Sequence, residues 1–184
     1  MIEVPYLDLG KIHDEIREEL DTAYHQVMDR EWFIGGEEDK KFERKFADFC
    51  GAKACVGCGN GLDAIRLILL AYGIGKGDEV IVPANTFIAT VLAITYVGAT
   101  PVFVDADITT YNIDIDKIEA KITDRTKAIV VVHLYGRAVN VVQLRKFADK
   151  YSLKIIEDAA QAHGAEINGV KTGSLGAVSY THLR

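Results

Sequence analysis

Short, continuous runs of apolar residues alternate with amphipathic stretches, and this alternation is the feature that most constrains the fold. The strongest run, Ile129-Val130-Val131-Val132, is long enough for a buried strand and far too short to cross a bilayer. Strands are predicted at residues 53–57, 79–82, 101–104, 127–133 and 153–156. Strands without polar alternation are typical of parallel sheets that are buried on both faces. The sequence therefore predicts an α/β fold, with a mainly parallel sheet flanked by helices on both faces.

Helices are predicted where apolar residues recur at spacings of three to four. The first covers residues 12–27, with one apolar stripe made of Ile12, Ile16, Leu20, Tyr24 and Val27. A second helix follows the break at residues 30–37 and carries Phe42, Phe46 and Phe49. The remaining helices are predicted at residues 62–72, 86–97, 114–122 and 141–151.

Charge and cysteine content exclude several classes of protein. The 184 residues include 21 Lys plus Arg and 27 Asp plus Glu, so the net charge is −6 and no basic cluster predicts a nucleic-acid partner. No membrane span and no signal peptide are predicted, and a cytoplasmic location is expected. The odd number of cysteines favours reduced thiols. Cys55 and Cys58 form a C-x-x-C, but no second pair completes a zinc site, so no metal is predicted and a buried strand is favoured over a redox role.

Ligands of parallel sheets bind beyond the carboxyl ends of the strands, so the segments that follow the predicted strands are the candidate sites. These segments are residues 57–63, 83–87, 105–107, 133–137 and 157–163. The first, Gly57-Cys58-Gly59-Asn60-Gly61, opens a predicted helix, where backbone N–H groups and the helix dipole attract an anion. It is neither a dinucleotide fingerprint nor a Walker sequence, and it is equally compatible with an ordinary turn.

Two other segments carry side chains suited to a flat, cationic ligand. Asp158 lies at the tip of a predicted strand, where it either caps a helix, pairs with a cation, or faces a protonated pyridine nitrogen. Phe87 either packs in the core or stacks on a ring. Gln161 and His163 follow Asp158 closely and have donors for ring substituents.

Five motifs occur in one order and carry a resemblance to a known family. They are Phe33-Ile34-Gly35-Gly36, Gly59-Asn60-Gly61-Leu62-Asp63-Ala64, Pro83-Ala84-Asn85-Thr86-Phe87, His133-Leu134-Tyr135-Gly136 and Glu157-Asp158-Ala159-Ala160-Gln161-Ala162-His163-Gly164. With them the chain resembles the DegT/DnrJ/EryC1/StrS sugar aminotransferases, which are pyridoxal-phosphate enzymes of the aspartate-aminotransferase fold (fold type I). The resemblance implies that residues 1–176 form an N-terminal arm and most of the large cofactor-binding domain, truncated before the C-terminal domain.

The resemblance also assigns roles to residues of this chain. The residues implied to bind pyridoxal 5′-phosphate are Asn60, Gly61, Leu62, Phe87, Asp158, Gln161 and His163. The first three hold the phosphate mainly through backbone N–H groups, and Leu62 stands where many relatives have a threonine hydroxyl. Phe87 stacks on the pyridine ring, and Asp158 keeps its nitrogen protonated so that the ring withdraws electrons. Gln161 bonds the phenolic oxygen, while His163 stands beside the ring.

The implied reaction is the transfer of an amino group from glutamate to a keto sugar linked to a nucleotide, by a homodimer. The family's Schiff-base lysine is absent from this chain, so no catalytic residue is assigned, and residues 177–184 are interpreted as a non-native tail. Two alternatives stay open. One is a sugar dehydratase of the same family with histidine in place of the lysine, and the other is a non-catalytic pseudoenzyme, against which the retention of Phe87, Asp158 and Gln161 argues.

Overall fold

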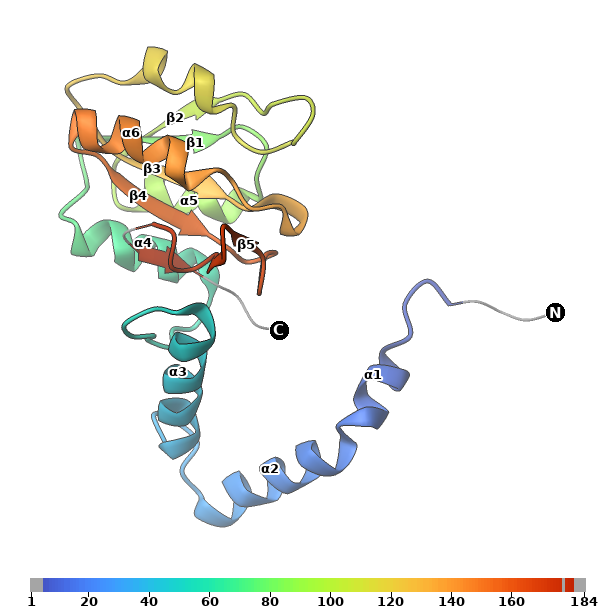
Figure 1. Ribbon diagram of the computed structural model, residues 1–184. Helices are drawn as coiled ribbons and strands as arrows, with labels where there is room; N and C mark the ends of the chain where they lie inside the picture. Colours follow the sequence, from blue (N-terminus) through green and yellow to red (C-terminus); the bar gives the residue numbers. More distant parts are fainter. Residues whose placement is uncertain (1–4, 177, 181–184) are drawn as a thin grey trace. The chain divides into compact units, whose positions relative to one another are not determined.

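The computed structural model describes residues 5–176 and 178–180, and the chain divides into two units, Met1–Arg44 and Lys45–Arg184 (Figure 1). The first unit contains helices α1 (Leu9–Glu15) and α2 (Arg17–Arg30) and most of α3 (Glu37–Cys50). The single helix predicted for residues 12–27 is therefore wrong. Ile16 interrupts it with φ −119° and ψ 14°, because its N–H bonds the carbonyl of His13 three residues back and ends α1.

The apolar stripe predicted for this region is present but is not buried. No residue of α1 or α2 is buried, and the side chains of Ile12 and Tyr24 are 57% and 60% exposed. Packing of an amphipathic face normally supplies most of a helix's stability. The described residues therefore provide little tertiary support for α1 and α2.

The second unit contains a five-stranded sheet whose neighbouring strands are all parallel, in the order β2-β1-β3-β4-β7. Its strands are β1 (Glu79–Pro83), β2 (Thr100–Val104), β3 (Thr126–Val132), β4 (Lys154–Asp158) and β7 (Val178–Tyr180). Its main helices are α4 (Gly61–Ala71), α5 (Ile88–Tyr96) and α6 (Val141–Tyr151). A separate antiparallel hairpin, β5 (Glu166–Ile167) and β6 (Val170–Lys171), turns at Asn168-Gly169, both with the positive φ that a tight hairpin turn requires.

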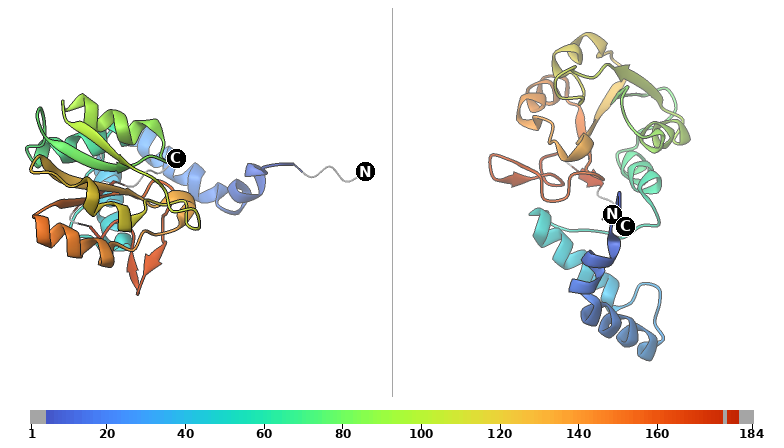
Figure 2. Two further views of the ribbon diagram at one scale, coloured as in Figure 1. Left: turned by 90° about the horizontal axis from the view of Figure 1, so that it is seen from above. Right: turned by 90° about the vertical axis from the view of Figure 1, so that its right-hand side faces the viewer.

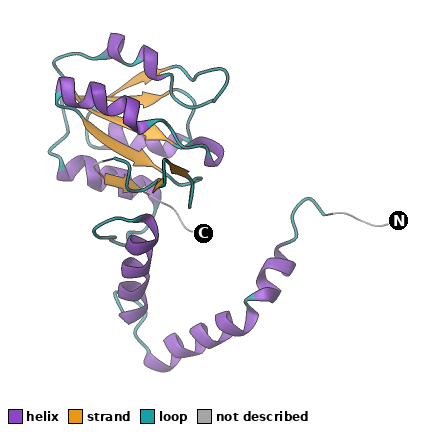
Figure 3. Cartoon of the chain, viewed as in Figure 1, coloured by secondary structure: helices purple, strands orange, loops and turns teal. Residues whose placement is uncertain are grey.

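Helices cover both faces of the sheet, as predicted (Figures 2 and 3). On one face, Ile65 and Leu69 of α4 and Ile94 of α5 pack on Val80, Val130 and Ile156. On the other face, Val141 and Leu144 of α6 pack on Ile129, Val131 and Ile155. The two sets of strand residues alternate along β3 and β4, because successive side chains of a strand point to opposite faces. The predicted fold class is confirmed.

Two predicted elements differ in the structure. Residues 53–57 form no strand, since they pair with no strand of the described chain and Val56 is 82% exposed. Cys55 is half-buried and Cys58 is exposed, so the buried-strand interpretation of the C-x-x-C is also wrong. Residues 114–122 form two 3₁₀ turns, η1 (Ile115–Lys117) and η2 (Glu119–Lys121), instead of one helix, because their N–H groups bond carbonyls three residues back.

Three residues of the predicted tail, Val178–Tyr180, form β7 and add a strand to the sheet. Val178 lies opposite Ile156, and Tyr180 lies opposite Asp158. Residues 177 and 181–184 lie outside the described residues. None of the helices in the described ranges is long and apolar enough to cross a membrane.

Candidate functional site

The N-termini of two helices lie at the carboxyl edge of the sheet. Helix α5 begins directly beyond the end of β1, with Phe87 as its N-cap. Helix α4 precedes β1 and leads into its amino end, so α4 runs antiparallel to the strands. Its 11 residues span about 16 Å, which matches the roughly 16 Å of the five-residue strand. The start of α4, with the glycine-rich segment before it, therefore lies at the same edge as the end of β4.

Asn60 fixes the start of α4. Its Oδ1 accepts the backbone N–H of Asp63 at 2.9 Å, and its Nδ2 donates to Oδ2 of Asp63 at 2.8 Å. The cap uses the N–H of Asp63, so the N–H groups of Gly61 and Leu62 in the first turn remain directed beyond the helix end. The side chain of Leu62 packs against the core of the α4–α5 face. Any contact of Leu62 with an anion at this helix end is therefore made by its backbone.

Asp158 is a buried carboxylate at the end of β4, with only 7% of its surface exposed. Its Oδ2 accepts the hydroxyl of Thr90 at 2.9 Å, and its Oδ1 accepts the N–H of Ala160 at 3.2 Å. Burial raises the pKa of Asp158, and the bonds from Ala160 and Thr90 and the nearby His133 oppose that rise. Asp158 forms no salt bridge with a cation of the described chain, so the interpretation as a salt-bridge partner is not supported.

Phe87 and Gln161 lie on loops at the same edge. Phe87 is 74% exposed, which argues against the core interpretation and leaves its ring available for stacking. Oε1 of Gln161 accepts the backbone N–H of Tyr135 at 2.8 Å. Because the amide oxygen of Gln161 accepts this bond, its Nε2 donors point away from Tyr135.

His163 makes its ring contact with another element. Its imidazole lies edge-on to Phe46 of α3, with ring centroids 6.2 Å apart and an interplanar angle of 68°. The structure therefore places Asn60, Phe87, Asp158 and Gln161 at the carboxyl edge of the sheet. The ring of His163 instead contacts α3.

A buried pair that was not predicted from the sequence lies beside Asp158. Nε2 of His133 lies 2.8 Å from Oε2 of Glu157, and both side chains are fully buried. Nδ1 of His133 accepts the N–H of Val139, so the ring proton lies on Nε2 and is donated to Glu157. The two oxygens of Glu157 also accept the N–H groups of Gly173 and Gly176. His133 and Glu157 each begin a family motif in the sequence, but neither motif shows that the two residues meet, or that Glu157 and Asp158 face opposite sides of the sheet.

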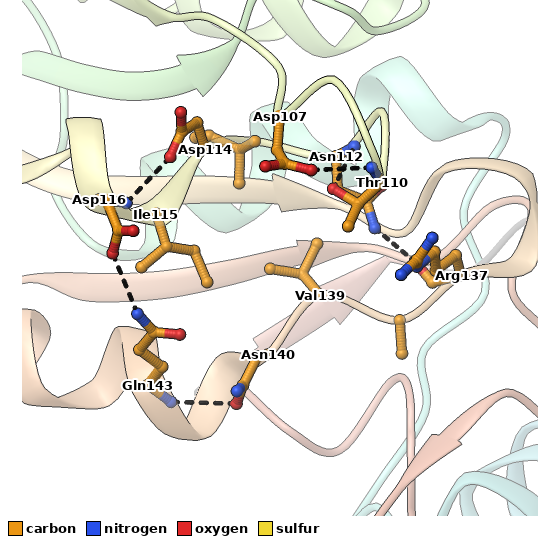
Figure 4. Close-up of a pocket in the computed structure, with 12 residues that line it drawn as sticks. Asp107, Thr110, Asn112, Asp114, Ile115, Asp116, Arg137, Val139, Asn140 and Gln143 are labelled. Atoms are coloured by element: carbon orange, nitrogen blue, oxygen red, sulfur yellow. Dashed lines mark hydrogen bonds between the residues drawn. The ribbon is translucent and has the colours of Figure 1, made fainter.

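A cavity of about 290 Å³ lies between the loop after β2 and the loop that leads into α6 (Figure 4). Asp107, Asp114, Asp116 and Arg137 are among its lining residues, and none of the predicted cofactor-binding residues lines it. Hydrogen bonds from Thr109 and Thr110 lower the pKa of Asp107 to about 2. The guanidinium of Arg137 donates to the carbonyl of Thr109 at 3.2 Å. These polar groups stabilise the loops, and the described residues contain no cluster of three or more potential metal ligands.

Comparison with known proteins identifies close relatives. The profile of the DegT/DnrJ/EryC1/StrS aminotransferase family matches residues 14–181. The chain is 57% identical over 173 residues to the dTDP-3-amino-3,6-dideoxy-alpha-D-galactopyranose transaminase of Aneurinibacillus thermoaerophilus, covering 94% of this chain and 48% of the relative. The chain thus spans about half the length of the curated relatives it matches.

Solved structures share the fold. The X-ray structure of DesV from S. venezuelae superposes with a TM-score of 0.92 at 42% identity, covering 98% of this chain and 48% of that one. The structure of ntda from Bacillus subtilis, solved with bound cofactor PMP, superposes with a TM-score of 0.84 at 37% identity, covering 94% and 40%.

Proposed function

The chain belongs to the DegT/DnrJ/EryC1/StrS aminotransferase family, and from this membership we propose that it is part of a pyridoxal-phosphate-dependent enzyme. The proposed reaction moves an amino group, supplied by glutamate, to a keto sugar linked to a nucleotide. Support comes from the 57% identity to a transaminase of a dTDP-linked sugar and from the relative solved with PMP. In this proposal residues 1–176 are the arm and most of the large domain, and residues 177–184 are a non-native tail.

The observation that carries the proposal is the buried carboxylate of Asp158 at the carboxyl edge. Such a carboxylate, which forms no salt bridge with the described residues, fits a ligand that carries a positive nitrogen. The N-terminus of α4 at the same edge fits a phosphate group. A phosphorylated pyridinium needs both features, and the exposed ring of Phe87 adds a stacking surface. The residues present therefore fit pyridoxal phosphate.

Each proposed residue has a defined task. Backbone N–H groups of Gly61 and Leu62, with the cap of Asn60, bind the phosphate, while Phe87 holds the ring plane. Asp158 keeps the proton on the pyridine nitrogen, Gln161 donates to the phenolic oxygen, and His163 is proposed to stand beside the ring. When bound, the protonated ring withdraws electrons from the carbon that exchanges its amino group.

Binding of pyridoxamine 5′-phosphate to the 184-residue chain tests the site, because this amine does not react with surface lysines. Because the chain lacks the Schiff-base lysine and the rest of the family's length, we expect weak but saturable binding by calorimetry, and a further loss of roughly tenfold or more in Asp158→Asn, since about 1.4 kcal/mol corresponds to tenfold. Asp149→Asn, an exposed carboxylate on α6, is the matched control and keeps the wild-type affinity. Equal affinity in Asp158→Asn and wild type contradicts the site.

The reaction needs a separate test on a chain of the relatives' full length. Resequencing the source DNA from the codon of Gly173 onward shows whether a Ser and Lys, a His, or neither follows Gly176. The extended protein is then incubated with glutamate and a dTDP-linked keto sugar, and mass spectrometry detects the product. Amination supports the transaminase, loss of water indicates the dehydratase, and no change with a bound cofactor indicates a pseudoenzyme.

We also propose that the full-length protein is a cytoplasmic homodimer. Light scattering during gel filtration checks its mass in solution, and a monomeric mass contradicts the dimer. The acidic net charge of −6 supports a small-molecule substrate over nucleic acid.

A further inference from the structure

Two threonine hydroxyls connect the start of α5 to Asp158. Oγ1 of Thr86 lies 2.9 Å from Oγ1 of Thr90, which in turn lies 2.9 Å from Oδ2 of Asp158. Thr90 is buried, whereas Thr86 is half-buried. We propose that Thr86 and Thr90 are positioning residues, whose chain of hydroxyls orients Asp158 and keeps it ionised for the cationic nitrogen of the cofactor. This inference rests on the proposed function and assigns a new role to two residues within that site.

The direction of each hydrogen bond follows from the number of protons. A hydroxyl has one proton, and an ionised carboxylate only accepts, so Thr90 donates its proton to Asp158. The oxygen of Thr90 must then accept the proton of Thr86. Donors that follow one another in this way polarise each other and strengthen the final bond. If Asp158 were protonated at Oδ2 and donated that proton to Thr90, the hydroxyl of Thr90 would donate elsewhere and the hydroxyl chain would rearrange.

The hydroxyls of Thr86 and Thr90 lie on the face of the sheet toward which the side chain of Asp158 points. Asp158 shares its face with Ile156, which packs in the α4–α5 core, and Thr90 approaches from α5. Glu157 points to the opposite face, where it binds His133, Gly173 and Gly176. The other ionisable group with an electrostatic effect on Asp158 is His133. His133 accepts the N–H of Val139 and bonds Glu157 on the opposite face, so the hydroxyl of Thr90 is the side-chain donor to Asp158 on the α5 side.

The same helix start also carries Phe87. Thr86 and Phe87 are adjacent, and Thr90 lies one helical turn further on. A shift of the first turn of α5 therefore moves the proposed stacking ring and the carboxylate partner together. This arrangement couples the plane of the ring to the orientation of the carboxylate that binds its nitrogen.

Titration of Asp158 in the ligand-free chain tests the inference directly. The carboxyl carbon of ¹³C-labelled aspartate is followed by NMR, with Asp158→Asn used for assignment. Thr90→Val keeps the shape of the side chain and removes the hydroxyl, and we expect the midpoint of Asp158 to move to higher pH. Thr86→Val, at a half-buried position, is expected to move it in the same direction by less. Thr90→Ser keeps the hydroxyl and is expected to restore the wild-type midpoint.

Thr95→Val in the same helix is the matched control, because the hydrogen bond of the Thr95 hydroxyl to the carbonyl of Leu92 lies within α5. Binding of pyridoxamine 5′-phosphate is measured in parallel, and Thr90→Val is expected to lose about tenfold in affinity, with a larger loss at lower pH. Unchanged Asp158 midpoints in folded Thr90→Val and Thr86→Val overturn the inference. If the wild type does not bind pyridoxamine 5′-phosphate but the Asp158 midpoint still shifts in the variants, the proposed function is contradicted. The effect of the two hydroxyls on the titration of Asp158 is then still established.

Discussion

At the residue scale, Glu157 joins three segments of the chain through one carboxylate. It binds His133 at the end of β3 and the backbone of Gly173 and Gly176 before β7. A side chain at position 176 would be tightly packed, since a Cβ there would lie 3.0 Å from the carbonyl oxygen of Ile155 and 3.2 Å from Glu157. The last turn before β7 is therefore fitted closely around this side chain.

Glu157→Gln is expected to lower the free energy of unfolding by about 3 kcal/mol, because an amide cannot accept all three donors and leaves buried groups unpaired. Urea unfolding measures the change. Glu119→Gln, which removes an exposed partner of Lys150, is the control and is expected to cost far less. Similar losses in the two variants would contradict the central role of Glu157.

The pKa of Asp158 has a second consequence for stability. Burial raises it above the ordinary value of 3.8, so the folded state binds the proton more tightly than the unfolded state. The stabilisation from Asp158 is complete below the unfolded pKa and is lost as pH rises through the folded pKa. Asp158→Asn mimics the protonated form at every pH. The stability of the wild type relative to this variant is therefore expected to fall as the pH rises from the unfolded pKa of about 4 through the raised folded pKa. A difference in the free energy of urea unfolding that stays constant as the pH rises would refute this prediction.

At the element scale, α4 and α6 are capped by the same chemistry at opposite faces of the sheet. Asn60 accepts the N–H of Asp63, and Asn140 accepts the N–H of Gln143 at 3.2 Å. Each Asn→Ala substitution is expected to cost about 1 kcal/mol of unfolding free energy. Only Asn60→Ala is expected to weaken binding of pyridoxamine 5′-phosphate, because only α4 is proposed to bind the phosphate. Equal weakening in Asn140→Ala would indicate a general loss of stability.

At the scale of the whole molecule, the two units differ in how much they bury. Helices α1 and α2 contain no buried residue, whereas all five residues of β1 and six of the seven of β3 are buried. Backbone amide protons exchange readily with solvent where local unfolding exposes few buried apolar side chains, because such unfolding costs little free energy. Hydrogen exchange by mass spectrometry is therefore expected to be much faster in α1 and α2 than in β1 and β3. If α1 and α2 exchanged as slowly as β1 and β3 in dilute protein, the apolar stripe of α1 and α2 would have to be covered.

The sequence by itself determined the elements whose signals are local. Apolar runs predicted β1, β3 and β4, and the spacing of apolar residues predicted α6 at its observed bounds. The order of the five motifs predicted the family. These predictions succeeded because periodicity and motif order are properties of neighbouring residues.

Only the tertiary structure decided which residues meet. Residues 53–57 have the composition of a strand, but a strand requires a partner, and the described chain supplies none. Thr90 and Asp158 lie 68 positions apart, and Glu157 binds Gly176 across 19 positions. No periodicity encodes these contacts, because they depend on the order and register of parallel strands. The candidate site could therefore be located at the strand ends from the sequence, whereas the hydroxyls and the buried His133–Glu157 pair around it became apparent only when the sheet was assembled.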